Sequence, residues 1–321
     1  MDSRRPLPHL SHEQLLGTVS YRDAVDAMRS AFLRISEYSQ LPREHVSVAE
    51  SELLVMPAFG PGGLGVKLLT LNPENPARDI PLINGAYLLF APQTLAVEST
   101  VDGAGLTALR TATVSALATD HLARPDAARL VVFGAGAQAA AHVAAMSAVR
   151  PIEHVTIVGT GSARTLALQA SVRATGLACE LGGPESVSDA EIVCTCTTSA
   201  TALFRADLVA PGTHINAVGV YRSDARELEG AVLGAAQVVV ETRAAALAEA
   251  GDVVMAIAEK WLTPDDLVEL GDVVAGRVAA ATPGASTVFK SVGLALEDLV
   301  LARLAHDRWA AAALAETAVP Q

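Results

Sequence analysis

The feature that most constrains the fold is the segment LVVFGAGAQA at residues 130–139. A short β-branched run, a glycine turn and an alanine-rich run predict a strand, a tight turn and a helix. The spacing is GxGxxA, in which Gly134 permits the turn and Gly136 lets the backbone approach a pyrophosphate. Ala137 and Gln138 then open the helix, whose N-terminal amides favour phosphate. The segment therefore predicts a Rossmann-type dinucleotide site.

The chain around this segment alternates between the two kinds of element, starting after Arg124-Pro125-Asp126. Alternation of this kind predicts a doubly wound parallel sheet. The predicted strands are 130–133, 155–158, 192–196, 214–218 and 237–240, and the predicted helices are 137–148, 163–174 and one from Pro264 onward.

The N-terminal part has a different pattern, with short apolar runs separated by Pro and Gly, which predicts an antiparallel or mixed sheet. The predicted strands are 53–56, 65–71 and 86–90, between helices at 20–39 and 107–122. Residues 287–314 predict one long amphipathic helix that packs back on this part. The expected α/β chain thus has a Rossmann-type domain at 125–289. A discontinuous α+β domain for dimerisation and substrate binding comprises 1–124 plus 290–321.

Composition excludes several classes of protein. The formal net charge of −12 argues against nucleic acid or an anionic membrane as the main partner. The longest uncharged stretch, 130–149, is divided by glycines into strand, turn and helix, so we expect no membrane span. Cys179, Cys194 and Cys196 have the spacing of neither a disulfide framework nor a metal site, and reduced thiols favour a cytoplasmic protein.

The end of the second strand of the alternating region bears on the choice of dinucleotide. A carboxylate there accepts the ribose 2′-OH of NAD, and its replacement by Arg favours NADP. This chain reads VGTGSAR at 158–164, with no carboxylate. Thr160, Ser162 and Arg164 are candidates to hold a 2′-phosphate, although Arg164 could simply be solvated on the helix. NADP(H) is therefore expected in preference to NAD(H).

Three cations stand out in this acidic chain. Lys67 is one of only three lysines, yet it lies within a predicted apolar strand. Arg110 lies among small and apolar residues, and Arg43 follows a proline in a loop. Each alone is an ordinary charge, but together they could bind a carboxylate, because Arg gives bidentate recognition and a Lys with a lowered pKa can donate a proton.

At this point several motifs occur together in a specific order. They are GVKLLTLNPEN, VDGAGLTALRTATVSALAT, VVFGAGAQA, CTTSATALF, PGTHINAVG, REL and VFKSVGLALEDL. This set resembles the ornithine cyclodeaminase/mu-crystallin family from about residue 40 to about residue 300.

The resemblance implies a homodimer with a dinucleotide-binding domain and a discontinuous substrate domain. It implies that the family's carboxylate-binding residues correspond to Arg43, Lys67 and Arg110. Further cofactor contacts implied by the motifs are Thr111, Thr197, Val218 and Ser291, the last beside the nicotinamide.

One departure from the family pattern is informative. In the cyclodeaminases a catalytic Asp follows closely after the HINAVG motif, whereas Tyr221 stands at that position here. Asp224 lies three residues later. The chain is therefore more similar to the reductase-like members, and Tyr221 and Asp224 are candidate assistants to Lys67 in catalysis.

These observations favour an NAD(P)H-dependent reductase of a small cyclic ketimine acid, pyrroline-2-carboxylate or piperideine-2-carboxylate, which would form an imino acid such as proline. Three alternatives stay open. The chain could be an ornithine cyclodeaminase, an alanine-type amino-acid dehydrogenase, or an NADP-dependent ligand-binding protein without catalysis.

Overall fold

The computed structural model describes residues 7–78, 80–279 and 284–317. The chain divides into two compact units. Unit 1 comprises Met1–Arg110 and Leu294–Gln321, and unit 2 comprises Thr111–Gly293. The first boundary falls inside helix α3 (Gly103–Leu122).

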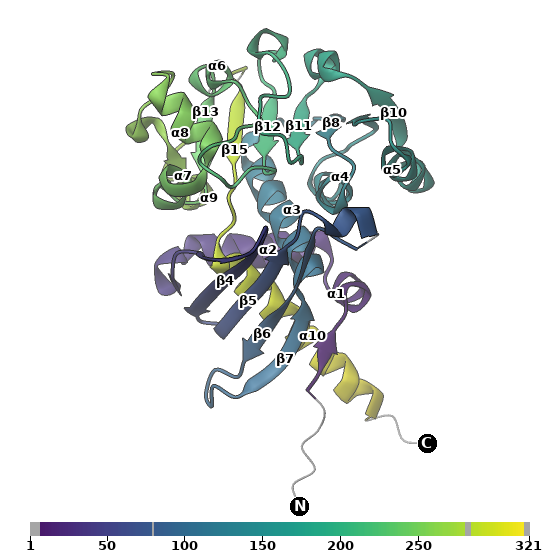
Figure 1. The fold of residues 1–321 in the computed structure, drawn as a ribbon, viewed down its shortest axis with the longest axis vertical. Helices are drawn as coiled ribbons and strands as arrows, with labels where there is room; N and C mark the ends of the chain where they lie inside the picture. The colour runs from purple at the N-terminus through teal and green to yellow at the C-terminus, as the bar shows by residue number, and fades with distance from the viewer. Residues whose placement is uncertain (1–6, 79, 280–283, 318–321) are drawn as a thin grey trace, which may run out of the picture. The chain divides into compact units, whose positions relative to one another are not determined.

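Unit 1 contains a seven-stranded sheet, counted over the described residues, with the order β1-β7-β6-β5-β4-β2 and with β3 paired to β4. All neighbours are antiparallel except β1 and β7. The mixed sheet predicted from the apolar runs is therefore present (Figure 1). Its strands are β1 (His9–Leu10), β2 (Ser39–Gln40), β3 (Glu44–Val48), β4 (Ser51–Gly60), β5 (Gly63–Leu71), β6 (Ile83–Phe90) and β7 (Val97–Asp102).

Helices cover one face of this sheet. α2 (Tyr21–Leu33) buries Val25, Met28 and Phe32, which recur at helical spacing, and α10 (Ala295–Thr317) packs on α2 and on β4, β5 and β6. Along the central strands alternate side chains are buried against these helices. The short helix α1 (His12–Thr18) contacts β7 and α10.

Unit 2 is a Rossmann-type unit built on an eight-stranded sheet, counted over the described residues, with the order β10-β9-β8-β11-β12-β15-β13-β14. Every pairing in it is parallel. Its strands are β8 (Arg129–Phe133), β9 (His154–Val158), β10 (Ala178–Gly182), β11 (Ile192–Thr195), β12 (His214–Ala217), β13 (Gln237–Val240), β14 (Val268–Glu269) and β15 (Thr287–Lys290). The helices wholly inside unit 2 are α4 (Ala137–Val149), α5 (Ala163–Ala174), α6 (Gly230–Gly234), α7 (Arg243–Glu249), α8 (Gly251–Ala258) and α9 (Leu270–Val274).

Two predictions about the C-terminal third are wrong. Residues 287–290 are strand β15, between β12 and β13, rather than the start of a long helix. All four residues are buried, because a central parallel strand has both faces covered and loses the alternation that marks a strand in sequence. The helix expected from Pro264 onward is a 3₁₀ turn, the short strand β14 and the short helix α9.

None of the helices in the described part of the chain has the length and apolar composition needed to span a bilayer.

Candidate active site

The glycine loop of unit 2 has the geometry that a pyrophosphate requires. Gly134 has φ +107°, and a Cβ there would lie 2.6 Å from the carbonyl oxygen of Cys196. Gly136 caps α4, and a Cβ built on it meets nothing within 4 Å. Ala137 follows as the first helical residue and is exposed, and its neighbour Gln138 is half-buried. The loop therefore leaves open the side from which a phosphate would meet the helix N-terminus, which fits a dinucleotide.

The loop after β9 is exposed and holds the three candidate 2′-phosphate ligands. Ser162 is the N-cap residue of α5, with its hydroxyl 3.3 Å from that of Thr165. Thr160 and Arg164 lie on either side, both exposed, and Gly161 has φ +69°. The loop presents two hydroxyls and a guanidinium to solvent.

The loops that follow β11 and β12 are organised by Glu227, a buried carboxylate. It accepts hydrogen bonds from the Thr195 hydroxyl, from the backbone N–H and hydroxyl of Thr197, and from the N–H of Gly219, at 2.7–2.8 Å. Burial raises the pKa of Glu227, although the Lys290 charge opposes that shift. Thr197 is thus held in place, and Val218 lies between the two restrained loops, with its N–H donating to Thr195.

A second buried carboxylate supports the first. Asp252 accepts the backbone N–H groups of Glu227 and Leu228, each at 2.8 Å. Its other oxygen lies 2.8 Å from Nζ of Lys290, which also donates to the carbonyl oxygen of Val220. These groups fix the loops at the carboxyl ends of the parallel strands, where ligands bind in sheets of this class.

Ser291 lies directly after β15, and its side chain is hydrogen-bonded within unit 2. Its hydroxyl donates to Glu241 at 2.5 Å, and the same carboxylate accepts the N–H groups of Val292 and Gly293. Thr111, the first residue of unit 2, is buried in α3.

The two candidate assistants differ in their surroundings. Tyr221 is half-buried and packs against the core of unit 2. The side chain of Asp224 is 65 % exposed and pairs with Arg222 at 2.6 Å. That hydrogen bond lowers the pKa of Asp224, which makes it a weaker base.

In unit 1 the buried charges form one cluster between β5, α3 and α10. Nζ of Lys67 lies 2.7 Å from Asp298, whose other oxygen lies 3.5 Å from Nε of Arg110. Arg110 also pairs with Glu297 at 3.0 Å. The Lys67, Glu297 and Asp298 side chains are essentially inaccessible to solvent. The structure therefore brings two of the three predicted cations together, with two carboxylates that sequence reasoning missed.

The charge of Lys67 is set by opposing effects. Burial, Arg110 and Arg43 lower its pKa while Asp298 raises it, and the balance is a pKa of about 7. Arg43 is half-buried in the loop between β2 and β3, and its charge, like that of Arg110, acts on Lys67. An amine with this pKa exchanges its proton near neutral pH.

Tyr87 is the neighbour of Lys67 on β6. It is fully buried, and its pKa is well above the ordinary value, chiefly because of burial and then because of the Asp298 charge. Tyr87 is therefore neutral at physiological pH. Its hydroxyl occupies the place where a Cβ on Gly65 would lie, which accounts for the glycine in the motif GVK.

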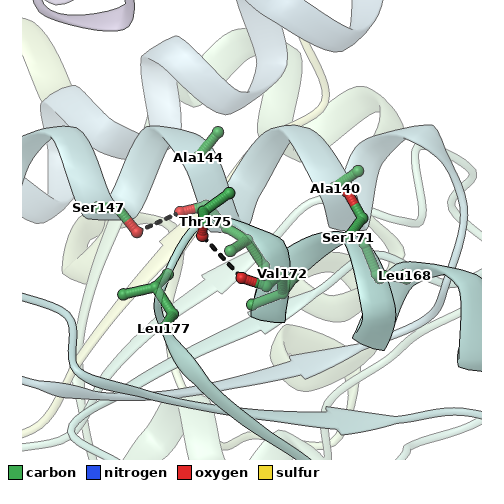
Figure 2. Close-up of a pocket in the computed structure, with 9 residues that line it drawn as sticks. Ala140, Ala144, Ser147, Leu168, Ser171, Val172, Thr175 and Leu177 are labelled. Carbon is green, nitrogen blue, oxygen red and sulfur yellow. Dashed lines mark hydrogen bonds between the residues drawn. The ribbon is translucent and has the colours of Figure 1, made fainter.

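Within the part of the chain that the structure describes, a surface groove between α4 and α5 is lined by no charged side chain, in contrast to the cluster around Lys67 (Figure 2). It is lined mainly by alanine, valine and leucine side chains. The hydroxyls of Ser147 and Thr175 donate to carbonyl oxygens of their own chain segments, those of Val143 and Val172. We assign it no ligand. Over the described residues, no group of three or more His, Cys, Asp or Glu side chains is arranged to hold a metal ion.

The chain matches the model of the ornithine cyclodeaminase/mu-crystallin family over residues 10–313. This protein belongs to that family. The membership predicted from the ordered motifs is therefore confirmed.

Named relatives in the ornithine cyclodeaminase/mu-crystallin family include reductases. The chain is 34 % identical over 272 residues to Delta(1)-pyrroline-2-carboxylate reductase of Bacillus cereus, covering 81 % of this chain and 82 % of the relative. It is 35 % identical over 257 residues to ketimine reductase mu-crystallin of Rattus norvegicus, covering 79 % and 80 %.

Solved structures extend the comparison to the fold. The Delta(1)-pyrroline-2-carboxylate reductase of Thermococcus litoralis, in complex with NADH and L-proline, superposes with a TM-score of 0.91 at 28 % identity, covering 96 % of this chain and 98 % of that one. A probable ornithine cyclodeaminase from Bordetella pertussis superposes with a TM-score of 0.88 at 31 % identity, covering 95 % and 98 %. The Rossmann-type fold expected from the glycine motif is confirmed.

Proposed function

We propose that this protein is an NAD(P)H-dependent reductase that converts a small cyclic ketimine carboxylate, pyrroline-2-carboxylate or piperideine-2-carboxylate, into the corresponding imino acid, proline or pipecolate. The observation that carries the proposal is the buried cluster of unit 1, in which a lysine with a pKa of about 7 lies beside Arg110. Relatives named pyrroline-2-carboxylate reductase and ketimine reductase support it.

Reduction of a C=N bond requires a hydride at carbon and a proton at nitrogen. The reduced nicotinamide, when bound, supplies the hydride. Arg43 and Arg110 would bind the substrate carboxylate, and the Lys67 ammonium would donate the proton to the ring nitrogen. Lys67 is then left as a neutral amine, which a pKa near 7 permits.

The residues of unit 2 would hold the dinucleotide. The pyrophosphate would lie on Gly134, Gly136 and the start of α4, and Thr197 and Val218 would border the nicotinamide half. We propose NADP(H) in preference to NAD(H), because the loop after β9 offers Thr160, Ser162 and Arg164 and no carboxylate.

We also propose a cytoplasmic homodimer. The face of the unit 1 sheet opposite α2 and α10 is apolar and half-exposed, with paired rows across β4, β5 and β6, which suits a second copy. The rows are Val55, Leu68 and Ala86; Pro57, Val66 and Leu88; Phe59, Leu64 and Phe90. The three cysteines are free thiols, in keeping with a reducing compartment.

The test is a spectrophotometric screen of the purified protein with NADPH and with NADH. Cofactor oxidation is expected with pyrroline- or piperideine-2-carboxylate, and faster with NADPH. Ornithine, and pyruvate with ammonia, are the comparison substrates. Turnover of ornithine to proline without either ketimine being reduced would contradict the proposal, as would reduction confined to pyruvate with ammonia.

A further inference from the structure

The cluster in unit 1 contains a carboxylate that the substrate-binding scheme does not use. Asp298 is fully buried in the first turn of α10. It contacts both buried cations of this cluster, at 2.7 Å from Nζ of Lys67 and 3.5 Å from Nε of Arg110. Its neighbour Glu297 contacts Arg110 at 3.0 Å.

A buried ion pair is weak evidence for a stabilising role, since desolvation offsets much of the attraction. The placement of Asp298 has a more specific consequence. Lys67 extends from the central strand β5 into a site where burial and two arginines all favour the neutral amine. Asp298 opposes these effects and favours the ammonium, through its charge and its hydrogen bond to Nζ.

The charged and titratable groups around Lys67 come from every element packed on it. α10 supplies Asp298, α3 supplies Arg110, the loop before β3 supplies Arg43, and β6 supplies Tyr87. The arginines are permanently charged, and the pKa of Tyr87 is raised well above its ordinary value. Near pH 7, Lys67 changes its charge while the two arginines and Tyr87 keep theirs.

We propose that Asp298 is a positioning residue, which holds Lys67 in its ammonium form and fixes its Nζ, so that a proton is available for the ketimine nitrogen at neutral pH. This inference rests on the proposed function for the destination of that proton. In the step concerned, an N–H bond of Lys67 breaks and an N–H bond forms on the ring nitrogen. The reduced nicotinamide, when bound, would supply the imine carbon with the hydride and its electron pair, and the neutral Lys67 regains a proton from water.

The scarcity of lysine gives a direct test. Protein labelled with ¹³C at lysine Cε shows three side-chain signals, from Lys67, Lys260 and Lys290. The signal lost in Lys67→Arg identifies Lys67. In Asp298→Asn we expect its titration midpoint to fall by about one to three pH units, the effect of removing an opposite charge at this distance. An unchanged or higher midpoint in the folded variant would overturn the inference.

Asp298→Glu is the conservative variant. It retains the negative charge, so the midpoint of Lys67 should return toward that of the wild type, and a midpoint as low as in Asp298→Asn would count against the proposal. Should Asp298→Asn not fold, Arg43→Ala supplies an opposite measurement in a half-buried loop. This substitution removes a cation that lowers the pKa of Lys67, so the titration midpoint of Lys67 should rise. An unchanged midpoint would contradict the proposal that neighbouring charges set the pKa of Lys67.

Kinetics separate this inference from the proposed function. The upper limb of the pH profile of kcat/KM for ketimine reduction should move with the Lys67 midpoint in each variant. If the titration midpoint of Lys67 shifts in Asp298→Asn but the wild-type protein reduces no ketimine, the role of Asp298 toward Lys67 is supported and the proposed function is contradicted. If ketimines are reduced but the upper limb of the pH profile of kcat/KM is the same in Asp298→Asn as in the wild type, the inference about Asp298 is contradicted instead.

Discussion

Lysine is rare in this chain, and two of its three lysines are fully buried in ion pairs. Lys67 pairs with Asp298 in unit 1, and Lys290 pairs with Asp252 in unit 2. An unpaired buried ammonium is costly, so each position implies a nearby carboxylate. The rarity of lysine singles out Lys67 in the sequence, but it singles out Lys290 equally, and sequence analysis left Lys290 without a role.

The first prediction concerns the proton on Lys67. Replacement by Met removes the donor and should lower kcat for ketimine reduction by roughly 10²- to 10⁴-fold, the usual contribution of a positioned acid. Replacement by Arg keeps a cation but not a group that releases a proton near pH 7, so it should lower kcat as well. Steady-state kinetics at pH 7 measure both, and wild-type kcat in Lys67→Arg would contradict the role of proton donor.

The second prediction concerns the direction in which kcat/KM of the wild-type enzyme changes with pH. Lys67 donates only when protonated, so kcat/KM should fall as the pH rises through about 7. A profile that rises through the same range would exclude Lys67 as the acid.

The carboxylate partners could not be read from the sequence. Glu297 and Asp298 stand at the start of a helix, where acidic residues are common because they complement the helix dipole. Nothing in their spacing indicates that Glu297 pairs with Arg110, or that Asp298 pairs with Lys67, which lies on a strand more than two hundred residues earlier. The same holds for Glu227, whose four donors come from the end of β11, from the loop after β11 and from the loop after β12, which the sheet order brings together.

At the level of elements, the glycine turn could be predicted from the sequence, because the positive φ of Gly134 and its close approach to Cys196 restrict the residue type. Gly134→Ala should destabilise the fold by about 1–3 kcal/mol, since it combines a positive φ with a contact at 2.6 Å to Cys196. Gly136→Ala should change stability by less than about 0.5 kcal/mol, since its Cβ meets nothing. The same variant should raise the Kd for NADPH at least about tenfold, equivalent to about 1.4 kcal/mol.

Thermal unfolding and cofactor titration by fluorescence measure the two effects. The pair is matched, because the chemical change is identical and the positions lie two residues apart. Unaltered NADPH affinity in Gly136→Ala would place the pyrophosphate elsewhere.

Another prediction at the level of elements concerns Glu227, which holds the loops after β11 and β12. Glu227→Gln replaces an acceptor oxygen by a donor against four existing donors, which should cost about 1–3 kcal/mol of unfolding free energy and weaken cofactor binding. Glu259→Gln, at an exposed pair with Arg226, is the control and should change stability by less than about 1 kcal/mol. Chemical denaturation and NADPH titration test both, and equal effects at the two sites would contradict the assigned role of Glu227.

For the whole molecule, the prediction concerns assembly. Val66 lies in the middle row of the apolar face of unit 1, between Pro57 and Leu88. Val66→Asp should convert a dimer into monomers at micromolar concentration, because a charge there cannot be buried against a second copy. Leu166→Asp, at an exposed position of α5, is the matched control and should leave the mass unchanged. Light scattering after size-exclusion chromatography gives the answer, and a dimeric Val66→Asp protein would exclude this face.

The position of β15 affects the order in which the chain can fold during synthesis. Among the strands that the structure describes, β15 is the one that links β13 and β14 to the rest of the unit 2 sheet, and it is the last of them in the chain. During synthesis, the five neighbouring strands β8 to β12 emerge first, and β13 and β14 follow. The strand β15, which joins these two groups in the sheet, emerges after both of them. Until Lys290 has emerged, the edges of β12 and β13 stay unsatisfied and open to wrong pairing, so the nascent chain should depend on chaperones late in translation.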